Sequence, residues 1–478
     1  RHRGSIGVKL SRREAIALTG TALVASGCSV SERLHALASK PPRPLTMNDE
    51  PGARALARAG FGHDPDSLEL VRELGVAAWL RAQTEAPVSE PAWLAQRVSR
   101  LDIVNFSPWE LRDWPEKSVV SQLQQHSILR AVHTPWQLRE RMVDFYSNHF
   151  NIYAKKGMGA YRKTLDDRIV VRPHVFGKFS DILNASAQSA AMLVYLDQQA
   201  STAAHPNENY ARELLELHSL GVDGGYTQED VMEVARCFTG WTEERGFLKA
   251  KGRFKFDPNL HDTDEKRVLG HVIPAGGGIE DGNRVLNIVA KHPSTARHVS
   301  RKLVRHFIGA GHDKAEEAVR EAFVRSGGET TAMLRALFER EEFLAGTPVL
   351  KRPFDFAVSA TRALGVKTDG GPAYQNHLAA MGQAPFQWPM PDGFPVEPEA
   401  WTGTLLARWN IANDLAHGRI SGTPGPKLEG TTEEIVSAVL GAPVGAPVCQ
   451  RVTSCLGGIT DLAEAAALAL CSPEFQYR

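Results

Sequence analysis

The sequence lacks a surplus of either charge, because 55 Lys and Arg residues balance 55 Asp and Glu residues. Binding to nucleic acid depends on surplus Lys and Arg that neutralise phosphates, so the composition gives no reason to expect a nucleic-acid partner. Hydrophobic residues make up 42% of the chain, as in ordinary soluble globular proteins. With 478 residues, the chain is long enough to bury a large core.

Several motifs that identify enzymes are also absent. There is no G-x-S-x-G sequence for a serine nucleophile, and no HExxH or HxH pair of metal ligands. The glycine-rich stretch PAGGGIEDG lacks the GK[ST] ending of a phosphate-binding loop, so we interpret it as a flexible turn. No CxxC pair occurs, which leaves a zinc site made of thiolates without support.

Strand-like alternation of apolar and polar residues is scarce, and no repeat of fixed period occurs. Apolar residues three and four positions apart dominate from Asp49 to about Gly240 and again after residue 282. Residues 246–282 are rich in Gly, Asp and Lys, and they predict a loop or a small β-hairpin. The expected fold is mainly α: one large multi-helix domain over residues 49–478, with irregular loops and short β inserts.

The N-terminal residues predict an export signal. Arg12 and Arg13 precede a weakly apolar run from Ala15 to Val24, a pattern typical of Tat signals. The run is shorter than the ~20 residues that a membrane-spanning helix needs. The predicted signal covers residues 1–28, and a Pro-rich linker follows over residues 29–48.

Two cleavage sites are consistent with this signal. Ala25-Ser26-Gly27-Cys28 resembles a lipoprotein box, in which Cys28 carries a lipid that anchors the protein to the membrane. Ala36-Leu37-Ala38 offers an ordinary signal peptidase a site after Ala38. In either case we expect export to the periplasm or a lipid-anchored position at the cell envelope.

Four cysteines follow Cys28 in the chain. Cys449 and Cys455 would close a small disulfide loop in an oxidising compartment. Cys237 lies inside a helical pattern, and we expect it to be a buried thiol.

The densest polar pattern is NENYARELLELH, residues 207–218. Asn207 is a suitable N-cap for this helix, and Thr227 is a suitable N-cap for the next one. At ~100° per residue, His218 falls on the apolar side. The opposite arc carries Glu208, Asn209, Arg212, Glu213 and Glu216.

Three interpretations of that arc remain open. In a solvated face, Arg212 would pair with Glu208 and Glu216, and each pair would contribute only ~0.2–0.5 kcal/mol. In a structural element, the same groups would form a buried network that fixes helix packing. The third interpretation is a functional site.

Scattered histidines with nearby carboxylates favour a site. His149 lies among aromatic residues in FYSNHFNIY, and His174 follows a proline in VVRPHVFG. His261 and Asp262 share the loop sequence FDPNLHDTDEK. Neutral imidazole is the usual protein ligand of first-row transition metals. The candidate metal ligands are His149, His174, His218 and His261.

The carboxylates would also suit chemistry without a metal. Glycoside cleavage uses two acids that flank the bond. The aromatic residues Phe386, Trp388 and Trp401 would stack on a sugar if they are exposed. The candidate catalytic residues are Glu208, Arg212, Glu213, Glu216 and Asp262.

Six stretches together resemble the domain-of-unknown-function 1800 (DUF1800) family of exported bacterial proteins. The resemblance extends from about residue 50 to the C-terminus, and the NENYARELLELH block is its most specific part. Tat-type signals are common in that family, and members are often encoded beside an exported family similar to sulfatases and phosphatases. The other stretches are ERMVDFYSNHFNIY, VVRPHVFGKFSDIL, SAAMLVYLDQ, FDPNLHDTDEKRVLGHVIPAGGGIEDG and MGQAPFQWPMPDGFP.

The resemblance implies a family without a general assigned function, so the activity remains a hypothesis from the residues. We expect an exported enzyme that depends on a metal and performs oxidation or hydrolysis on an envelope or extracellular substrate, for example a polysaccharide. The alternatives are a non-catalytic helical scaffold that binds glycans or proteins, and a metal-free glycosidase with two carboxylates.

Overall fold

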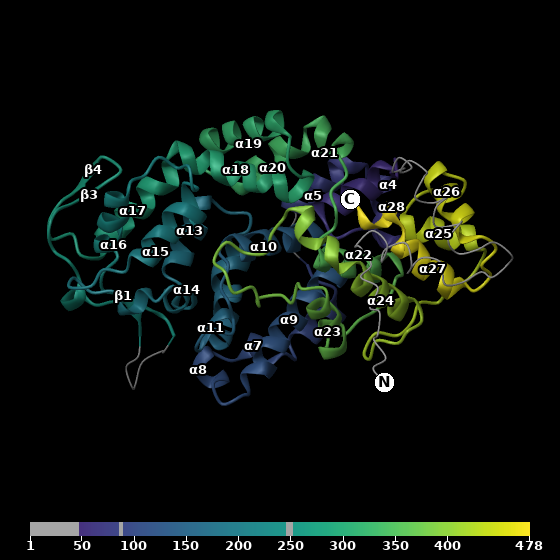
Figure 1. The fold of residues 1–478 in the computed structure, drawn as a ribbon, viewed down its shortest axis with the longest axis horizontal. Helices are drawn as coiled ribbons and strands as arrows, with labels where there is room; N and C mark the ends of the chain where they lie inside the picture. The colour runs from purple at the N-terminus through teal and green to yellow at the C-terminus, as the bar shows by residue number, and fades with distance from the viewer. Residues whose placement is uncertain (1–46, 86–88, 245–251) are drawn as a thin grey trace, which may run out of the picture. The chain divides into compact units, whose positions relative to one another are not determined.

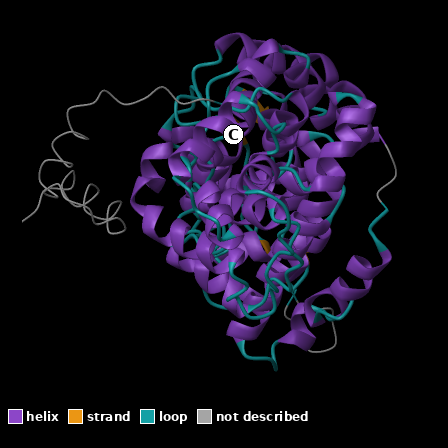
Figure 2. Ribbon diagram, turned by 90° about the vertical axis from the view of Figure 1, so that its right-hand side faces the viewer, coloured by secondary structure: helices purple, strands orange, loops and turns teal. Residues whose placement is uncertain are grey.

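The fold is mainly helical, as the periodicity of the apolar residues predicts (Figure 2). The structure is a computed structural model, and it describes residues 47–85, 89–244 and 252–478. The predicted export signal and most of the predicted linker lie outside these ranges. No helix in the described ranges is both long and apolar enough to cross a membrane.

The chain begins its described part with short helices and then forms two long ones, α9 and α10 (Figure 1). The helices up to residue 237 are α3 (Pro51–Ala59), α4 (Pro65–Leu74), α5 (Val76–Glu85), α6 (Ala92–Val98), α7 (Asp102–Asn105), α8 (Pro108–Leu111), α9 (Glu116–His133), α10 (Gln137–His149), α11 (Gly159–Asp166), the π-helix η1 (Asp167–Val171), α12 (Arg172–His174), α13 (Phe179–Ala187), α14 (Ala190–Tyr195), the 3-10 helix η2 (Gln198–Ala200), α15 (Glu208–Glu213), the π-helix η3 (Leu214–Ser219) and α16 (Gln228–Cys237).

The second half of the chain is helical after a short β region. Its helices are the 3-10 helix η4 (Pro258–Leu260), α17 (Ile279–Lys291), α18 (Pro293–Ile308), α19 (Asp313–Ser326), α20 (Thr330–Phe338), α21 (Glu341–Ala345), α22 (Pro353–Ala363), α23 (Pro372–Ala380), the 3-10 helix η5 (Pro398–Thr404), α24 (Leu405–Ala416), α25 (Thr432–Leu440), α26 (Pro447–Leu456), α27 (Leu462–Cys471) and α28 (Pro473–Gln476).

The predicted β insert is confirmed in its described part. Strands β1 (Trp241–Glu243) and β2 (Phe254–Phe256) pair antiparallel, with Trp241 opposite Phe256. Strands β3 (Lys266–Val268) and β4 (His271–Ile273) form a second antiparallel pair. Both sheets have two strands, so the β region is an excursion from the helical core.

Capping residues mark several helix ends as the sequence predicts. The Asn207 side chain accepts hydrogen bonds from the first turn of α15, and Thr227 forms a capping box with Asp230 at the start of α16. Thr134 does not cap the helix that follows it in the chain. Thr134 ends α9 instead, because its N–H donates to Arg130, and α10 begins at Gln137.

Apolar side chains form two large cores. The first joins α3–α5 and α10 to the helices from α13 to α21. The second joins the C-terminal part of α9 to the helices from α22 to α28. Figure 1 shows α10 between these two groups of helices, and its apolar side chains belong to the first core.

Charged side chains of α10 form buried ion pairs with neighbouring helices. Arg141 donates to Asp355 of α22 at 2.6 Å, and both side chains are at most 3% exposed. Asp144, one turn further along α10, pairs with Arg352 at the start of α22. On another side of α10, Glu140 accepts from Arg172 at 2.8 Å. Burial of these charges is tolerated because each has a partner.

The sequence left a disulfide between Cys449 and Cys455 open, and in the structure both thiols are free. Both residues lie on α26, where a separation of six residues turns the side chains to different sides of the helix. Cys449 is buried and Cys455 is exposed. Cys237 is a buried thiol, as predicted.

We predict that Asp355→Asn destabilises the fold by ~3–5 kcal/mol, the usual effect of removing one charge from a buried pair. The change keeps the shape of the side chain, but it leaves Arg141 and Arg352 without their shared carboxylate. Urea denaturation followed by circular dichroism measures the free energy of unfolding. Glu321→Ala, which breaks the exposed pair with Arg325, is the control and should change stability by at most ~0.5 kcal/mol. Equal effects of the two substitutions would contradict this account.

Candidate functional site

A loop over residues 383–396 is held against the C-terminal end of α10 by side-chain hydrogen bonds. The Asn151 amide donates to the carbonyls of Trp388 and Met390, at 3.1 and 2.6 Å. Asn148 both donates to and accepts from the backbone of Phe394. These bonds satisfy backbone groups that a loop cannot pair internally, so the loop has a defined position.

Two backbone positions show how tightly this loop is constrained. Phe386 has a φ of 63°, in the left-handed region that side chains other than glycine rarely adopt. Its ring is buried and its carbonyl accepts from Ala154 at 2.9 Å, which holds the conformation. Gly393 has a φ of 81°, and a Cβ there would collide with the backbone of Asn148. Strain of this kind is often found at functional sites.

The predicted helix over residues 207–218 changes type in its middle. It is α-helical only to Glu213, and from Leu214 to Ser219 it is a π-helix. Leu220 N–H donates to Leu215, five residues back, which is the π-helical spacing. The predicted Arg212–Glu216 pair is therefore not formed, because the π-turn rotates Glu216 away from the α-helical register.

Three side chains form hydrogen bonds with backbone carbonyls of this π-helix. Ser219 donates from Oγ to Leu214 at 2.6 Å. His298 of α18 bonds through Nε2 to the carbonyl of Leu217 at 3.1 Å, and His149 of α10 bonds through Nε2 to that of His218 at 3.1 Å. The rings of His149 and His218 lie 6.4 Å apart, so two predicted site residues are neighbours. Two imidazoles, one from α10 and one from α18, thus bond to the backbone of the π-helix.

Glu213 and Glu216 are partly exposed and lie beside each other at the junction of α15 and η3. Burial raises the pKa of Glu213, and repulsion from Glu216 and Asp392 adds to this increase. Burial raises the pKa of Tyr226, and the neighbouring charge of Glu216 adds to this increase. The arrangement combines a carboxyl group that holds its proton more strongly with a second carboxylate.

We call Glu213, Glu216, Tyr226 and Asp392, which influence one another's pKa values, the Glu213 site. The charge of Asp392 also acts on Lys302 of α18. Burial lowers the pKa of Lys302 to about 8, although attraction to Asp392 opposes the decrease. Asp392 is exposed, and its carboxylate accepts from the indole of Trp388 at 3.1 Å. The sequence analysis missed Lys302 and Asp392, because one lies in a basic helical run and the other in a Pro-Asp-Gly turn, which are both ordinary patterns.

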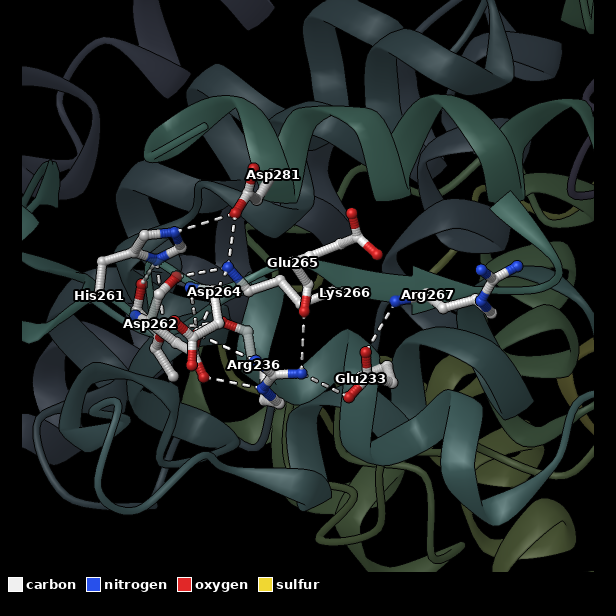
Figure 3. Close-up of polar contacts among 10 residues, drawn as sticks. Glu233, Arg236, His261, Asp262, Asp264, Glu265, Lys266, Arg267 and Asp281 are labelled. Atoms are coloured by element: carbon white, nitrogen blue, oxygen red, sulfur yellow. Dashed lines mark hydrogen bonds and ion pairs between the residues drawn. The ribbon is translucent and has the colours of Figure 1, made fainter. Parts of the chain in front are cut away.

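His261 and Asp262 are placed in a different group, next to β3 (Figure 3). His261 bonds through Nε2 to Asp281 at 3.2 Å, and Lys266 pairs with the same carboxylate at 2.7 Å. Asp262 accepts from Arg236 at 2.8 Å. None of the interactions of these residues reaches Glu213 or Glu216 in the structure as described. This ion-pair group fixes the β3–β4 hairpin on α16 and α17.

The remaining predicted site residues have separate partners. Glu208 and Arg212 are exposed, 3.7 Å apart, and both bond to Gln228 of α16. His174 bonds through Nδ1 to the carbonyl of Val170 at 2.6 Å. Across the described residues, no group of three or more His, Cys, Asp or Glu side chains is placed to hold a metal ion.

The aromatic residues of the loop differ in exposure. Trp401 and Phe386 are buried, at 4% and 8% exposure, and they are not available to stack on a ligand. Trp388 is partly exposed beside Asp392. Of the three predicted stacking residues, only Trp388 faces solvent at the Glu213 site.

A family described as "Protein of unknown function (DUF1800)" matches residues 54–477. The chain belongs to the DUF1800 family. The DUF1800 match covers both cores, the loop over residues 383–396 and the Glu213 site. No curated protein and no solved structure matches the chain.

The buried histidines of this DUF1800 protein predict a loss of stability in acid. Burial lowers the pKa of His298 to about 4 and that of His218 to about 3, from an ordinary value near 6.5. Below pH 6.5 the unfolded chain therefore binds protons that the folded chain does not. The free energy of unfolding should fall as pH decreases from about 6.5 to about 4.

His298→Gln tests one of these groups, because Gln can still donate to the carbonyl of Leu217 but does not titrate. The slope of unfolding free energy against pH between 6.5 and 4 should decrease by up to ~1.4 kcal/mol per pH unit. Denaturant titrations at several pH values measure it. His271→Gln, at an exposed position, should leave the slope unchanged. An unchanged slope in His298→Gln would mean that His298 titrates normally in the folded protein.

Proposed function

We propose that this DUF1800 protein is an exported enzyme that hydrolyses glycosidic bonds in an envelope or extracellular polysaccharide. The observation that carries the proposal is the environment of Glu213. Burial and two neighbouring carboxylates favour its protonated form, which is the state that a general acid needs before it protonates a leaving group.

Glu216 supplies the second carboxylate of the pair. It lies three residues after Glu213, on the π-helix, and its charge helps to raise the pKa of Tyr226. Glycoside hydrolysis uses one acid to protonate the glycosidic oxygen and one carboxylate to activate water or attack the sugar. Glu213 takes the first role in this proposal and Glu216 the second, while Trp388 offers an aromatic surface for the sugar.

We favour this carboxylate chemistry over a metal-dependent reaction because of where the histidines point. His149 and His174 bond to backbone carbonyls, and His261 bonds to Thr239 and Asp281. His218 is buried beside His149, but His174 and His261 do not join them. The pKa of Glu213 on α15, in contrast, is raised by burial and by the carboxylates of Glu216 on η3 and Asp392 in the loop, which supports a carboxylate mechanism.

A non-catalytic scaffold is the second candidate, and the Glu208–Arg212–Gln228 contacts favour it. They join α15 to α16 on an exposed face, as a structural network would. On this alternative, Glu213 and Glu216 would bind a glycan without cleaving it.

Glu213→Gln separates the two candidates. The amide keeps the shape of the side chain but cannot donate the proton, so the release of reducing ends should fall by ~10²–10⁴-fold. The substrates are peptidoglycan, polygalacturonate, laminarin and chitosan, and the thermal unfolding midpoint should stay unchanged. Glu229→Gln, at an exposed position on α16, should retain wild-type activity. Wild-type release by Glu213→Gln, or no release from any substrate by the unmodified enzyme, would reject the proposal.

Export is proposed from Arg12 and Arg13 followed by the short apolar run. Changing both arginines to lysine should retain the precursor in the cytoplasm, because the Tat receptor recognises the arginine pair. Cell fractionation and immunoblotting measure the distribution, and Cys28→Ser should release the protein from membrane pellets if Cys28 is lipidated. Normal periplasmic yield of the double variant, or of the unmodified chain in a strain without Tat, would show that export uses another route.

A further inference from the structure

Three buried arginines converge where α10, the start of α22 and the segment after α28 meet. Arg141 donates to Asp355 at 2.6 Å. The nearest guanidinium nitrogens of Arg352 and Arg478 lie 3.4 and 3.9 Å from oxygens of the same carboxylate. Asp144 adds one further carboxylate, which pairs with Arg352. The three arginine side chains are at most 4% exposed, and we call these five residues the arginine cluster.

The two carboxylates of the arginine cluster face three guanidinium groups, and the neighbouring side chains add no negative charge. His306 lies 4.0 Å from Asp144, and burial keeps its ring neutral because it lowers the pKa well below the ordinary value. Lys351 and Arg408 are buried beside the cluster and are basic. The three guanidinium nitrogens of Arg408 donate to uncharged groups. Positive charge is therefore in excess in this part of the interior.

Several hydrogen-bond donors of the arginine cluster are left over. Four buried nitrogens have no partner among the described residues: Nε of Arg141, Nη1 of Arg352, and Nε and Nη1 of Arg478. Nη2 of Arg478 donates to the carbonyl of His306 at 2.6 Å, and the backbone oxygen of Arg478 accepts from Val349. Buried N–H groups are nearly always paired, and an unpaired charged donor is strongly destabilising. An acceptor from outside the chain would satisfy them.

We propose that a chloride ion binds between Arg352 and Arg478 in the arginine cluster. Both guanidinium groups lie against Asp355, which brings them together, and each has an unpartnered Nη1. Chloride accepts N–H groups from several directions and also balances one positive charge, whereas a buried water would satisfy the donors but not the charge. The ion would fix α10, α22 and the segment after α28 to one another, independently of any glycan hydrolysis.

Thermal unfolding of the full chain measures this binding. Mixtures of sodium chloride and sodium gluconate at constant ionic strength separate a specific site from general screening, because gluconate is too large for an enclosed site. Chloride should raise the unfolding midpoint by ~3 °C and the rise should saturate, as for a ligand present at about 100 times its dissociation constant. Bromide should act like chloride.

Arg478→Gln should abolish the chloride dependence. The substitution removes one positive charge, but the amide can still donate to the carbonyl of His306. Circular dichroism checks that the variant folds. Arg325→Gln is the matched control, because Arg325 is an arginine on the surface of α19 and is 69% exposed. It should keep the full chloride dependence.

Crystals of the unmodified protein grown in sodium bromide locate the ion without any substitution. Bromide scatters anomalously, so we expect an anomalous difference peak within hydrogen-bonding distance of Arg352 and Arg478. Two results would overturn the proposal: an unfolding midpoint that is the same in chloride and in gluconate, or bromide crystals in which these nitrogens bond only to water. Neither result depends on whether the protein cleaves a polysaccharide, so the proposed function stands or falls separately.

Discussion

Pairing of buried charges on α10 is the constraint on which the rest of the fold depends. Glu140 faces Arg172, and Arg141 faces Asp355, so one helix carries charges of both signs into the interior. An unpaired charge there would cost several kcal/mol, and this cost holds α12 and α22 in one position relative to α10. The same helix ends at His149, next to the asparagines that hold the loop over residues 383–396.

The Glu213 site follows from that placement together with a defect in helix geometry. In the π-helix after Glu213, backbone carbonyls lack the hydrogen bonds that they would accept in an α-helix. His149 and His298 bond to two of these carbonyls. Each imidazole comes from a different helix, so α10 and α18 are both fixed on η3. Glu216 on η3 and Asp392 in the loop then both act on the pKa of Glu213.

Structural and functional charges can be distinguished in this protein by their partners. Lys266, Asp281, Arg236 and Asp262 pair with one another, and their positions are explained by the hairpin that they hold. The pKa of Glu213, in contrast, is raised by burial and then by neighbours of its own sign, Glu216 and Asp392. Groups that stability alone does not explain are the best candidates for contact with a substrate.

The sequence by itself determined the helical class, the β insert, the caps at Asn207 and Thr227 and the DUF1800 resemblance, because these depend on residues close together in the chain. Local pattern also indicated Glu213, Glu216 and His218. Tertiary structure decided the rest. It separated His261 and Asp262 from Glu213, placed Glu208 and Arg212 on the surface, and brought Asp392 near Glu213. The hydrophobic periodicity of the sequence does not predict these contacts, because they join segments up to 180 residues apart and depend on which buried charges form pairs.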